Sequence, residues 1–329
     1  MDLPRTPPPT LSQSALPQSE GTLRVERAPR PRVLPRLGEC PVCREDLGAP
    51  ASNGYRSCDS CGTSSARQGA IDVQDGYHFH DLEITEPNAA TTLQRLDHLE
   101  AGLARAAQLE NRPGRLGQER ILHLGCGRGT LVESARAAGH DAWGLDVSAP
   151  ALRACERRGV GPRCRLVPSL TEAPEGWAGR FDAVLAVDLI EHYERPLEIF
   201  QAARRYLRPG GWLIGTTRNG RSAWRGWLGD DWPGVTWPQY HPTLLDARGI
   251  QTLAGILSAG PVWTESLCDR GRTGELLEAR VVRDSRAPRT NLRRNLLTAA
   301  LWPSEWLRQR RAGKPGGPEG DTLRFGVQI

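Results

Sequence analysis

The 329-residue sequence predicts a doubly wound α/β fold, in which helices cover both faces of a mostly parallel sheet, preceded by a small four-cysteine module. From residue 120 onward, short apolar runs alternate with segments of helical periodicity, which is typical of such a sheet. A glycine-rich turn, "GCGRGT", joins the first apolar run to the first helical segment. Two CxxC pairs stand close together ahead of this region.

Residues 1–37 are rich in proline and arginine and show no periodic apolar face, so we expect a disordered tail. The formal net charge is +5, but Lys314 is the sole lysine, and this arginine bias gives weak support for a nucleic-acid surface. Eight cysteines in a chain of this length do not indicate a disulfide scaffold. The sequence shows neither a signal-peptide-like apolar run nor about 20 consecutive apolar residues, so we expect a cytoplasmic protein without a transmembrane segment.

Residues 38–66 contain "CPVC" and "CDSC", with cysteines at Cys40, Cys43, Cys58 and Cys61. A tetrahedral zinc ion needs four converging soft ligands, and each CxxC turn supplies two of them. The alternative is a pair of redox CxxC motifs, but a short segment with little core of its own favours a zinc ribbon. Four thiolates leave no open coordination position, so we expect a structural zinc that carries out no chemistry.

Residues 67–117 include a leucine- and alanine-rich run, 91–110, which predicts a helical linker covering the edge or mouth of the next domain. In that domain, residues 118–329, the expected strands are 120–125, 141–147, 164–167, 181–188 and 211–217. The expected helices are 130–139, 150–159 and 195–211. The nearly continuous apolar residues of the strands fit burial on both faces of the sheet.

The glycine turn predicts a nucleoside-cofactor site. Gly125, Gly127 and Gly129 let the backbone bend sharply and approach a ligand closely. Asp146 follows Gly125 by 21 residues, at the end of the second strand, where a carboxylate can accept hydrogen bonds from ribose hydroxyls. The third glycine comes two residues after the second, whereas the dinucleotide fingerprint places it three after. This spacing favours S-adenosylmethionine over a nicotinamide dinucleotide.

The segment from about 118 to 268 resembles the class I S-adenosylmethionine-dependent methyltransferases, on the motifs "ILHLGCGRG", "GLDVS", "FDAVLAVDLIEH" and "LRPGGWLIGTT". The whole chain looks like bacterial methyltransferases with an N-terminal CxxC/CxxC zinc module. The resemblance implies a seven-stranded Rossmann-like sheet whose last strand is antiparallel, supplied by "DTLRFGVQI" or by "ARVVRD". It places the cofactor against residues of the glycine turn and of the strand ends, namely Gly125, Cys126, Gly127, Gly129, Asp146, Val147, Ser169, Leu170 and Asp188.

Two positions depart from the family pattern. His123 stands where the family usually has Asp or Glu; it is either a tolerated replacement or a sign of weakened cofactor binding, and the glycines and Asp146 favour activity. The third motif, "LVPSL", lacks the common acidic residue, so Ser169 and Leu170 are placed beside the adenine by position alone.

The stretch "DLIEHYERP" is the candidate catalytic segment. Asp188, Glu191 and His192 have i, i+3, i+4 spacing, and one helical turn would put them on one face beside the methyl donor. Ubiquinone-pathway O-methyltransferases and small-RNA 3′-end methyltransferases have a similar pattern that binds a divalent cation, which would activate an acceptor hydroxyl. His192 as a metal-free base is the second interpretation. A helix-entry feature without a catalytic role is the third.

Residues 219–242 form a tryptophan-rich segment, predicted as a loop, whose indoles could wall the acceptor site: Trp224, Trp227, Trp232 and Trp237. His241 either faces this site or holds the loop down. Residues from about 286 to 320 are an arginine-rich insertion around "LLTAALWPSEWL", which is a membrane- or partner-binding face, a helix packed on its own domain, or a poorly ordered insertion.

The function predicted from the sequence is transfer of a methyl group from S-adenosylmethionine to an oxygen, or less favourably a nitrogen, of a small molecule or glycan precursor. The first alternative is an RNA methyltransferase acting on a nucleobase or ribose, because some ribosomal-RNA methyltransferases also carry a zinc module. Scattered basic residues and the lack of interleaved aromatics in the module speak against it. The second alternative is a non-catalytic protein that binds cofactor or a partner.

Overall fold

The computed structural model describes residues 38–66, 89–110, 118–267 without 233, 236, 237 and 239, and 320–329. These residues belong to one compact unit, Leu34–Ile329. The predicted tail, the basic insertion up to residue 319 and the competing strand "ARVVRD" lie outside the described residues. Within the described chain, none of the helices has the length and apolarity needed to traverse a bilayer.

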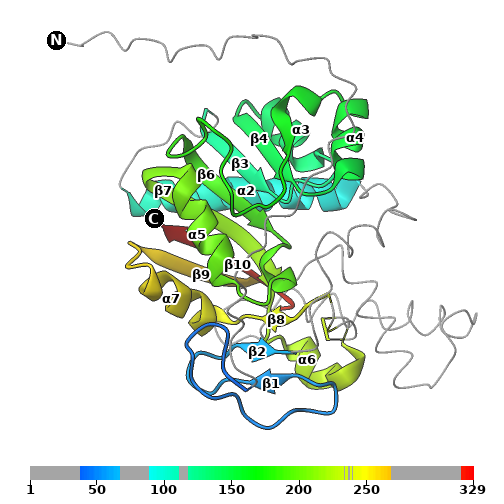
Figure 1. Cartoon of the computed structure of the whole chain (residues 1–329), viewed down its shortest axis with the longest axis vertical. Coiled ribbons are helices and arrows are strands. Elements are labelled where there is room, and N and C mark those ends of the chain that lie inside the picture. The colour runs from blue at the N-terminus through cyan, green and yellow to red at the C-terminus, as the bar shows by residue number, and fades with distance from the viewer. Residues whose placement is uncertain are drawn as a thin grey trace, which may run out of the picture. The chain divides into compact units, whose positions relative to one another are not determined.

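Seven strands form the main sheet in the order β5-β4-β3-β6-β7-β10-β9 (Figure 1). Their bounds are β3 Arg120–Leu124, β4 Asp141–Asp146, β5 Cys164–Leu166, β6 Phe181–Val187, β7 Leu207–Arg218, β9 Val262–Leu267 and β10 Thr322–Gln328. The strands from β5 to β7 are parallel, whereas β10 runs antiparallel to both β7 and β9. The predicted doubly wound sheet with an antiparallel last strand is therefore confirmed, and "DTLRFGVQI" supplies that strand.

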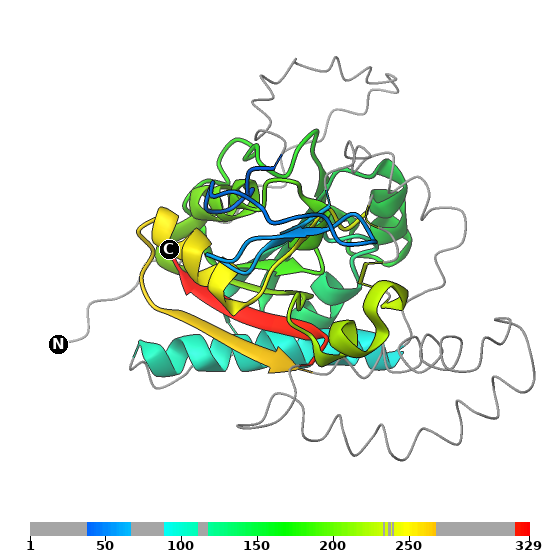
Figure 2. The same cartoon turned by 90° about the horizontal axis from the view of Figure 1, so that it is seen from below.

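Helices cover both faces of the sheet. On one face lie α2 Ala89–Leu109, α3 Thr130–Ala137 and α4 Ala149–Arg157, and on the other α5 Leu197–Tyr206 and α7 Ala247–Ile256. Helix α2 follows one face of the sheet (Figure 2). It lies so close that a Cβ atom at Gly102 would stand 2.6 Å from the Ile214 side chain in β7.

The central strands explain the position of the glycine turn. Strand β3 pairs with β4 on one side and β6 on the other, and residues 121–124 are buried. Apolar side chains on both surfaces of these strands form two core clusters, one under each helical layer. The loop after β3 therefore emerges at the carboxyl edge of the parallel strands, where doubly wound folds bind ligands.

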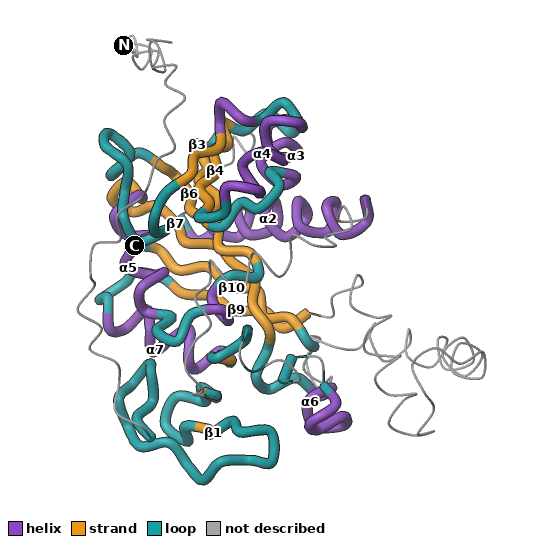
Figure 3. Tube along the Cα trace, turned by 45° about the vertical axis from the view of Figure 1, so that its right-hand side comes forward, coloured by secondary structure: helices purple, strands orange, loops and turns teal. Residues whose placement is uncertain are grey.

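The four-cysteine module has little regular structure, as the tube of Figure 3 shows. Strands β1 Arg56–Ser57 and β2 Ser64–Ser65 are antiparallel, and β2 pairs with β8 Thr243–Leu244 from the larger domain. The module thus shares a three-stranded sheet, β1-β2-β8, with that domain.

The tryptophan-rich segment is not the loop that the sequence predicted. It contains α6 Ala223–Leu228 and the 3₁₀ helix η3 Gly229–Asp231. The Ser222 side chain caps α6 by accepting a hydrogen bond from the Trp224 backbone N–H. Trp224 and Trp232 are buried, so the expected open indole wall is wrong for these two residues. The side chains of Trp227 and Trp237 lie outside the described part of the structure.

Candidate cofactor and active site

The glycine loop has the backbone geometry that only glycine adopts readily. Gly125, Gly127 and Gly129 have φ values of 67°, 54° and 76°, all in the left-handed region. A Cβ atom at Gly129 would stand 2.9 Å from the sulfur of Cys155, whereas one at Gly127 would meet no atom within 4 Å. The backbone of Gly127 therefore borders open space into which a ligand can approach.

Asp146 holds this loop from behind. One carboxylate oxygen accepts a hydrogen bond from the Gly127 N–H at 2.7 Å, and the other accepts from the Ser148 N–H at 2.9 Å. The side chain is fully buried. Burial raises the pKa of Asp146 from 3.8 to about 6, although both N–H donors favour the ionised form. The predicted contact with ribose stays a prediction, while the structure shows a contact with the loop itself.

Three cysteine side chains meet beneath the loop. The sulfur atoms of Cys126, Cys155 and Cys164 all lie within 4.8 Å of one another. The Cys155 thiol donates to the Gly127 carbonyl at 3.3 Å, so both polar backbone groups of Gly127 are held from inside the fold. Hydrogen bonding with Cys155 raises the pKa of Cys126 well above its ordinary value. Cys126 is buried, and its cofactor contact stays a prediction, whereas Cys155 and Cys164 were not predicted.

His123 is buried on β3, and neither ring nitrogen has a hydrogen-bond partner among the described residues. Burial lowers the pKa of His123 from 6.5 to about 3, and the charge of Arg95 lowers it further. The ring is therefore uncharged at neutral pH.

Asp188 and Arg95 form an ion pair beside His123. The Arg95 guanidinium, from α2, lies 3.2 Å from one Asp188 oxygen, and the Thr216 hydroxyl donates to the other at 3.3 Å. Asp188 has a φ of 49°, an uncommon conformation for a residue other than glycine that is often found at functional sites. Arg95 was missed because its 93-residue separation from Asp188 gives no local signal.

The remaining predicted cofactor contacts, Val147, Ser169 and Leu170, differ in burial and in their nearest neighbours. Val147 is partly exposed, whereas Ser169 and Leu170 are buried. A Cβ atom at Gly125 would stand 3.9 Å from the Leu170 side chain, so Leu170 lies next to the loop. The Ser169 hydroxyl pairs with the Thr171 hydroxyl at 2.7 Å.

The candidate catalytic segment is a 3₁₀ turn, η2 Ile190–His192, instead of the α-helical turn that the spacing suggested. Glu191 is buried and accepts a hydrogen bond from the Thr217 hydroxyl at 2.8 Å. His192 bonds through Nδ1 to the Tyr240 carbonyl at 2.6 Å, and its ring centroid lies 5.1 Å from that of His241. A carbonyl only accepts, so Nδ1 carries a proton, and in the neutral ring Nε2 carries the lone pair.

Asp188, Glu191 and His192 therefore have separate partners. Among the described residues, the groups of three or more metal-ligating side chains whose donor atoms lie within 4.8 Å of one another are two cysteine clusters. The expected triad for a divalent cation is not among them. Its three residues are brought to one region, but their donor atoms do not converge as a metal ion requires.

Residues 92–255 match a family model described as a methyltransferase domain. The chain carries a methyltransferase domain. This domain is similar to the ubiquinone biosynthesis O-methyltransferase of Bordetella avium (strain 197N), at 33% identity over 110 residues that cover 32% of this chain and 45% of the relative. The enzyme of the same name from Chromobacterium violaceum is 31% identical over 108 residues, which cover 31% of this chain and 45% of that enzyme. The chain thus spans less than half the length of these curated relatives.

Solved structures of methyltransferases are similar to this chain over most of its length. A SAM-dependent methyltransferase from Archaeoglobus fulgidus has a TM-score of 0.46 and 14% identity, covering 77% of this chain and 99% of that one. Phosphoethanolamine N-methyltransferase 2 from Haemonchus contortus has a TM-score of 0.47 and 18% identity, covering 79% and 60%. At these identities the likeness concerns the fold alone.

The four-cysteine module stands ahead of the methyltransferase domain, and its thiols converge as a structural metal site requires. The sulfur atoms of Cys40, Cys43, Cys58 and Cys61 lie within 4.8 Å of one another. Cys40 and Cys61 are 3.5 Å apart, and Cys43 and Cys58 are 3.4 Å apart. Such separations fit a tetrahedral zinc ion with Zn–S bonds of about 2.3 Å.

Proposed function

We propose that the chain is an S-adenosylmethionine-dependent methyltransferase that methylates an oxygen atom of a small molecule or glycan precursor. The observation that carries the cofactor assignment is the glycine loop, with three left-handed glycines after β3 and open space beside Gly127. When bound, S-adenosylmethionine supplies a methyl group on a positively charged sulfur atom. The matched relatives, named as ubiquinone biosynthesis O-methyltransferases, support a small-molecule oxygen as acceptor.

The Arg95–Asp188 pair is suited to the amino-acid end of the cofactor, which carries one carboxylate and one ammonium group. The guanidinium of Arg95 can bind a carboxylate, and the carboxylate of Asp188 can bind an ammonium group. His123 stays uncharged beside them, so it does not repel that ammonium group. Both charged side chains are partly exposed and can exchange their mutual contact for contacts with a ligand.

His192 is the proposed general base. Its Nδ1–H is fixed by the Tyr240 carbonyl, which leaves the Nε2 lone pair to take a proton from the acceptor hydroxyl. Removing that proton makes the acceptor oxygen a stronger nucleophile for the methyl group. Because Asp188 and Glu191 each bind other side chains, this role needs no divalent cation.

Label transfer tests the proposal. The protein is incubated with S-adenosylmethionine labelled in its methyl group, together with the host cell's small-molecule extract or, separately, with its RNA. We expect label in the small-molecule fraction and a loss of transfer in His192→Ala. Label in RNA alone would replace the proposal with the nucleic-acid alternative. Cofactor binding without transfer to either fraction would favour a non-catalytic role.

A further inference from the structure

We propose that the four-cysteine module positions the acceptor side of the active site, because it fixes residues 240–246 and through them His192 and His241. That His192 and His241 act in catalysis rests on the proposed function. That the module holds these two histidines in place does not depend on it. The module would then position residues for the reaction in addition to its role as a structural metal site. Four sets of contacts carry the inference.

The first contact is a shared sheet. Strand β2 of the module pairs with β8, Ser64 opposite Leu244 and Ser65 opposite Thr243. One residue further on, the Ala66 N–H donates to the Pro242 carbonyl at 2.9 Å. The backbone of residues 242–244 is therefore held by the chain that directly follows the second CxxC turn.

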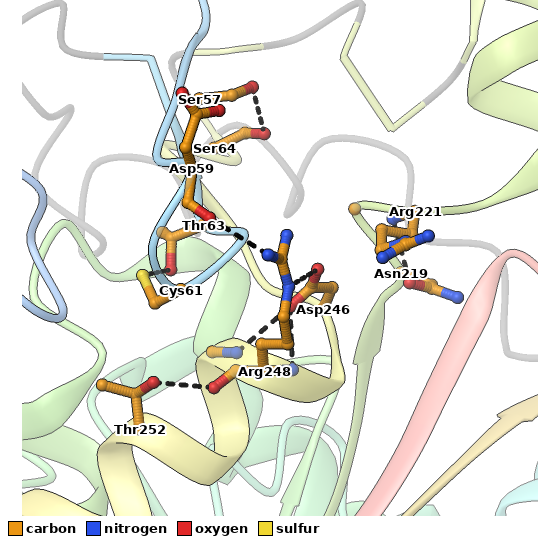
Figure 4. Close-up of polar contacts among 12 residues, drawn as sticks. Ser57, Asp59, Cys61, Thr63, Ser64, Asn219, Arg221, Asp246, Arg248 and Thr252 are labelled. Carbon is orange, nitrogen blue, oxygen red and sulfur yellow. Dashed lines mark hydrogen bonds and ion pairs between the residues drawn. The ribbon is translucent and has the colours of Figure 1, made fainter. Parts of the chain in front are cut away.

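The second contact joins that CxxC turn to the start of α7 (Figure 4). The buried Asp246 carboxylate caps α7 by accepting from the backbone N–H groups of Arg248, at 2.8 Å, and of Gly249, at 3.1 Å. The Arg248 guanidinium donates to the Asp59 carbonyl at 3.0 Å, inside the turn. A Cβ atom at Gly62 would stand 2.1 Å from the Asp246 carboxylate, so the turn and the helix cap are in close contact. The conformation of the turn thus sets the end of the 240–246 segment.

The third contact is Tyr55. Its hydroxyl donates to the His241 carbonyl at 2.6 Å, and its side chain is 1% exposed. The ring belongs to a core cluster with side chains of the tryptophan-rich segment and of β8: Trp224, Leu228, Trp232, Val235 and Leu244. The Arg225 guanidinium binds the Ser64 hydroxyl at 2.9 Å and the Gly220 carbonyl at 2.8 Å, which adds a polar link between the same two parts.

The last contact reaches the proposed base. Two successive backbone carbonyls each accept a hydrogen bond: that of Tyr240 from His192 Nδ1, and that of His241 from the Tyr55 hydroxyl. A shift of the His241 carbonyl would move the acceptor that fixes the His192 tautomer. The path therefore runs from the cysteine turn through Tyr55 and β8 to the ring of His192.

Hydrogen–deuterium exchange of the full chain tests this coupling without any acceptor. Tyr55→Phe removes the bond to His241 and leaves the four cysteines intact. We expect unchanged zinc content, about two- to tenfold faster exchange over residues 240–249, and a changed ring-nitrogen NMR signal of His192. Tyr206→Phe is the matched control, because Tyr206 is also buried and donates to the Glu172 carbonyl at 2.9 Å, far from the module in sequence. This variant should leave the exchange rates of residues 240–249 unchanged.

A second arm removes the metal. Cys58→Ser should release zinc and increase exchange over 240–249 more than Tyr55→Phe does, while exchange in β3 and β4 and the affinity for S-adenosylmethionine stay near wild type. If Cys58→Ser unfolds the whole chain, the Tyr55→Phe result decides. Unchanged exchange over 240–249 and an unchanged His192 signal in Tyr55→Phe would overturn the proposal. A failed methyl-transfer assay with the expected exchange pattern would instead contradict only the proposed function.

Discussion

Acidification should weaken cofactor binding through one carboxyl group, that of Asp146. In its ionised form this group accepts from the Gly127 and Ser148 N–H groups and keeps the glycine loop in place. Its pKa is raised by burial to about 6, within an accessible pH range. Protonation replaces one acceptor oxygen by a hydroxyl, which loosens the loop and also weakens any contact with ribose hydroxyls.

The size of the effect follows from that pKa. If the ionised form alone binds, the apparent Kd for S-adenosylmethionine rises about twofold at pH 6 and about tenfold at pH 5, relative to neutral pH. The effect cannot come from unfolding driven by this group. Because its folded pKa lies above the unfolded value of 3.8, Asp146 stabilises the fold at low pH and loses this contribution as the pH rises through about 6.

Calorimetric titration between pH 7.5 and 5 measures the change, with Asp146→Asn as the control. Asparagine does not ionise and has a single side-chain acceptor for two N–H donors. The variant should therefore bind S-adenosylmethionine more weakly by about 1.5–3 kcal/mol, and its affinity should not depend on pH. The same pH slope in both proteins would assign the titration to another group. A wild-type affinity that does not change down to pH 5 would refute the role given to this carboxylate.

Three further predictions concern the module, the base and the buried histidine. Purified protein should contain one zinc per chain and lose it in Cys58→Ser; stoichiometric zinc in Cys40→Ser/Cys58→Ser would contradict the ribbon assignment. His192→Ala should lower kcat by roughly 10²–10⁴ with cofactor affinity retained, and chelation that leaves the zinc of the four-cysteine module in place should not change the wild-type rate; a rate that such chelation abolishes and added magnesium or manganese restores would favour the cation mechanism. The pKa of His123 is lowered to about 3, so below pH 6.5 the unfolded chain binds a proton that the folded chain does not. The free energy of unfolding should therefore decrease as the pH is lowered from 6.5, by about 2 kcal/mol at pH 5. Urea melts of His123→Leu should lack this part of the pH dependence, and an identical pH dependence in both proteins would rule it out.

The sequence predicted those parts of the fold in which burial or backbone conformation restricts the residue type at each position. The apolar runs of β3, β4, β6 and β7 and the glycine spacing carry their own signal, because burial on both faces and left-handed backbone each restrict residue type. The edge strand β5 is different, since Arg165 and Leu166 are exposed. Strand β9 gave no such signal: "VWTESL" is half-buried along its length and includes the exposed Glu265. The surface that α2 covers also has no local signal, since helical periodicity shows which side of a helix is apolar but not which surface it meets.

Long-range packing explains the errors at the site. The indoles of Trp224 and Trp232 were expected to line an open acceptor wall, but Tyr55 of the module packs with them and closes the cluster. Likewise, the spacing of Asp188 and His192 suggested one metal-binding face. In the structure Asp188 pairs with Arg95, and His192 bonds to the Tyr240 carbonyl. Partners so distant in sequence leave no local pattern.

Binding of S-adenosylmethionine at the glycine loop is the central claim, and equilibrium dialysis with labelled cofactor tests it most directly. Gly127 and Gly176 both have positive φ, 54° and 75°, and a Cβ atom at either position would meet nothing within 4 Å. Valine therefore strains the backbone similarly at both sites, but only Gly127 lies in the loop. We predict one cofactor per chain for wild type and for Gly176→Val, and at least about tenfold weaker binding for Gly127→Val. No binding by the wild type, or equal binding by Gly127→Val and Gly176→Val, would contradict the claim.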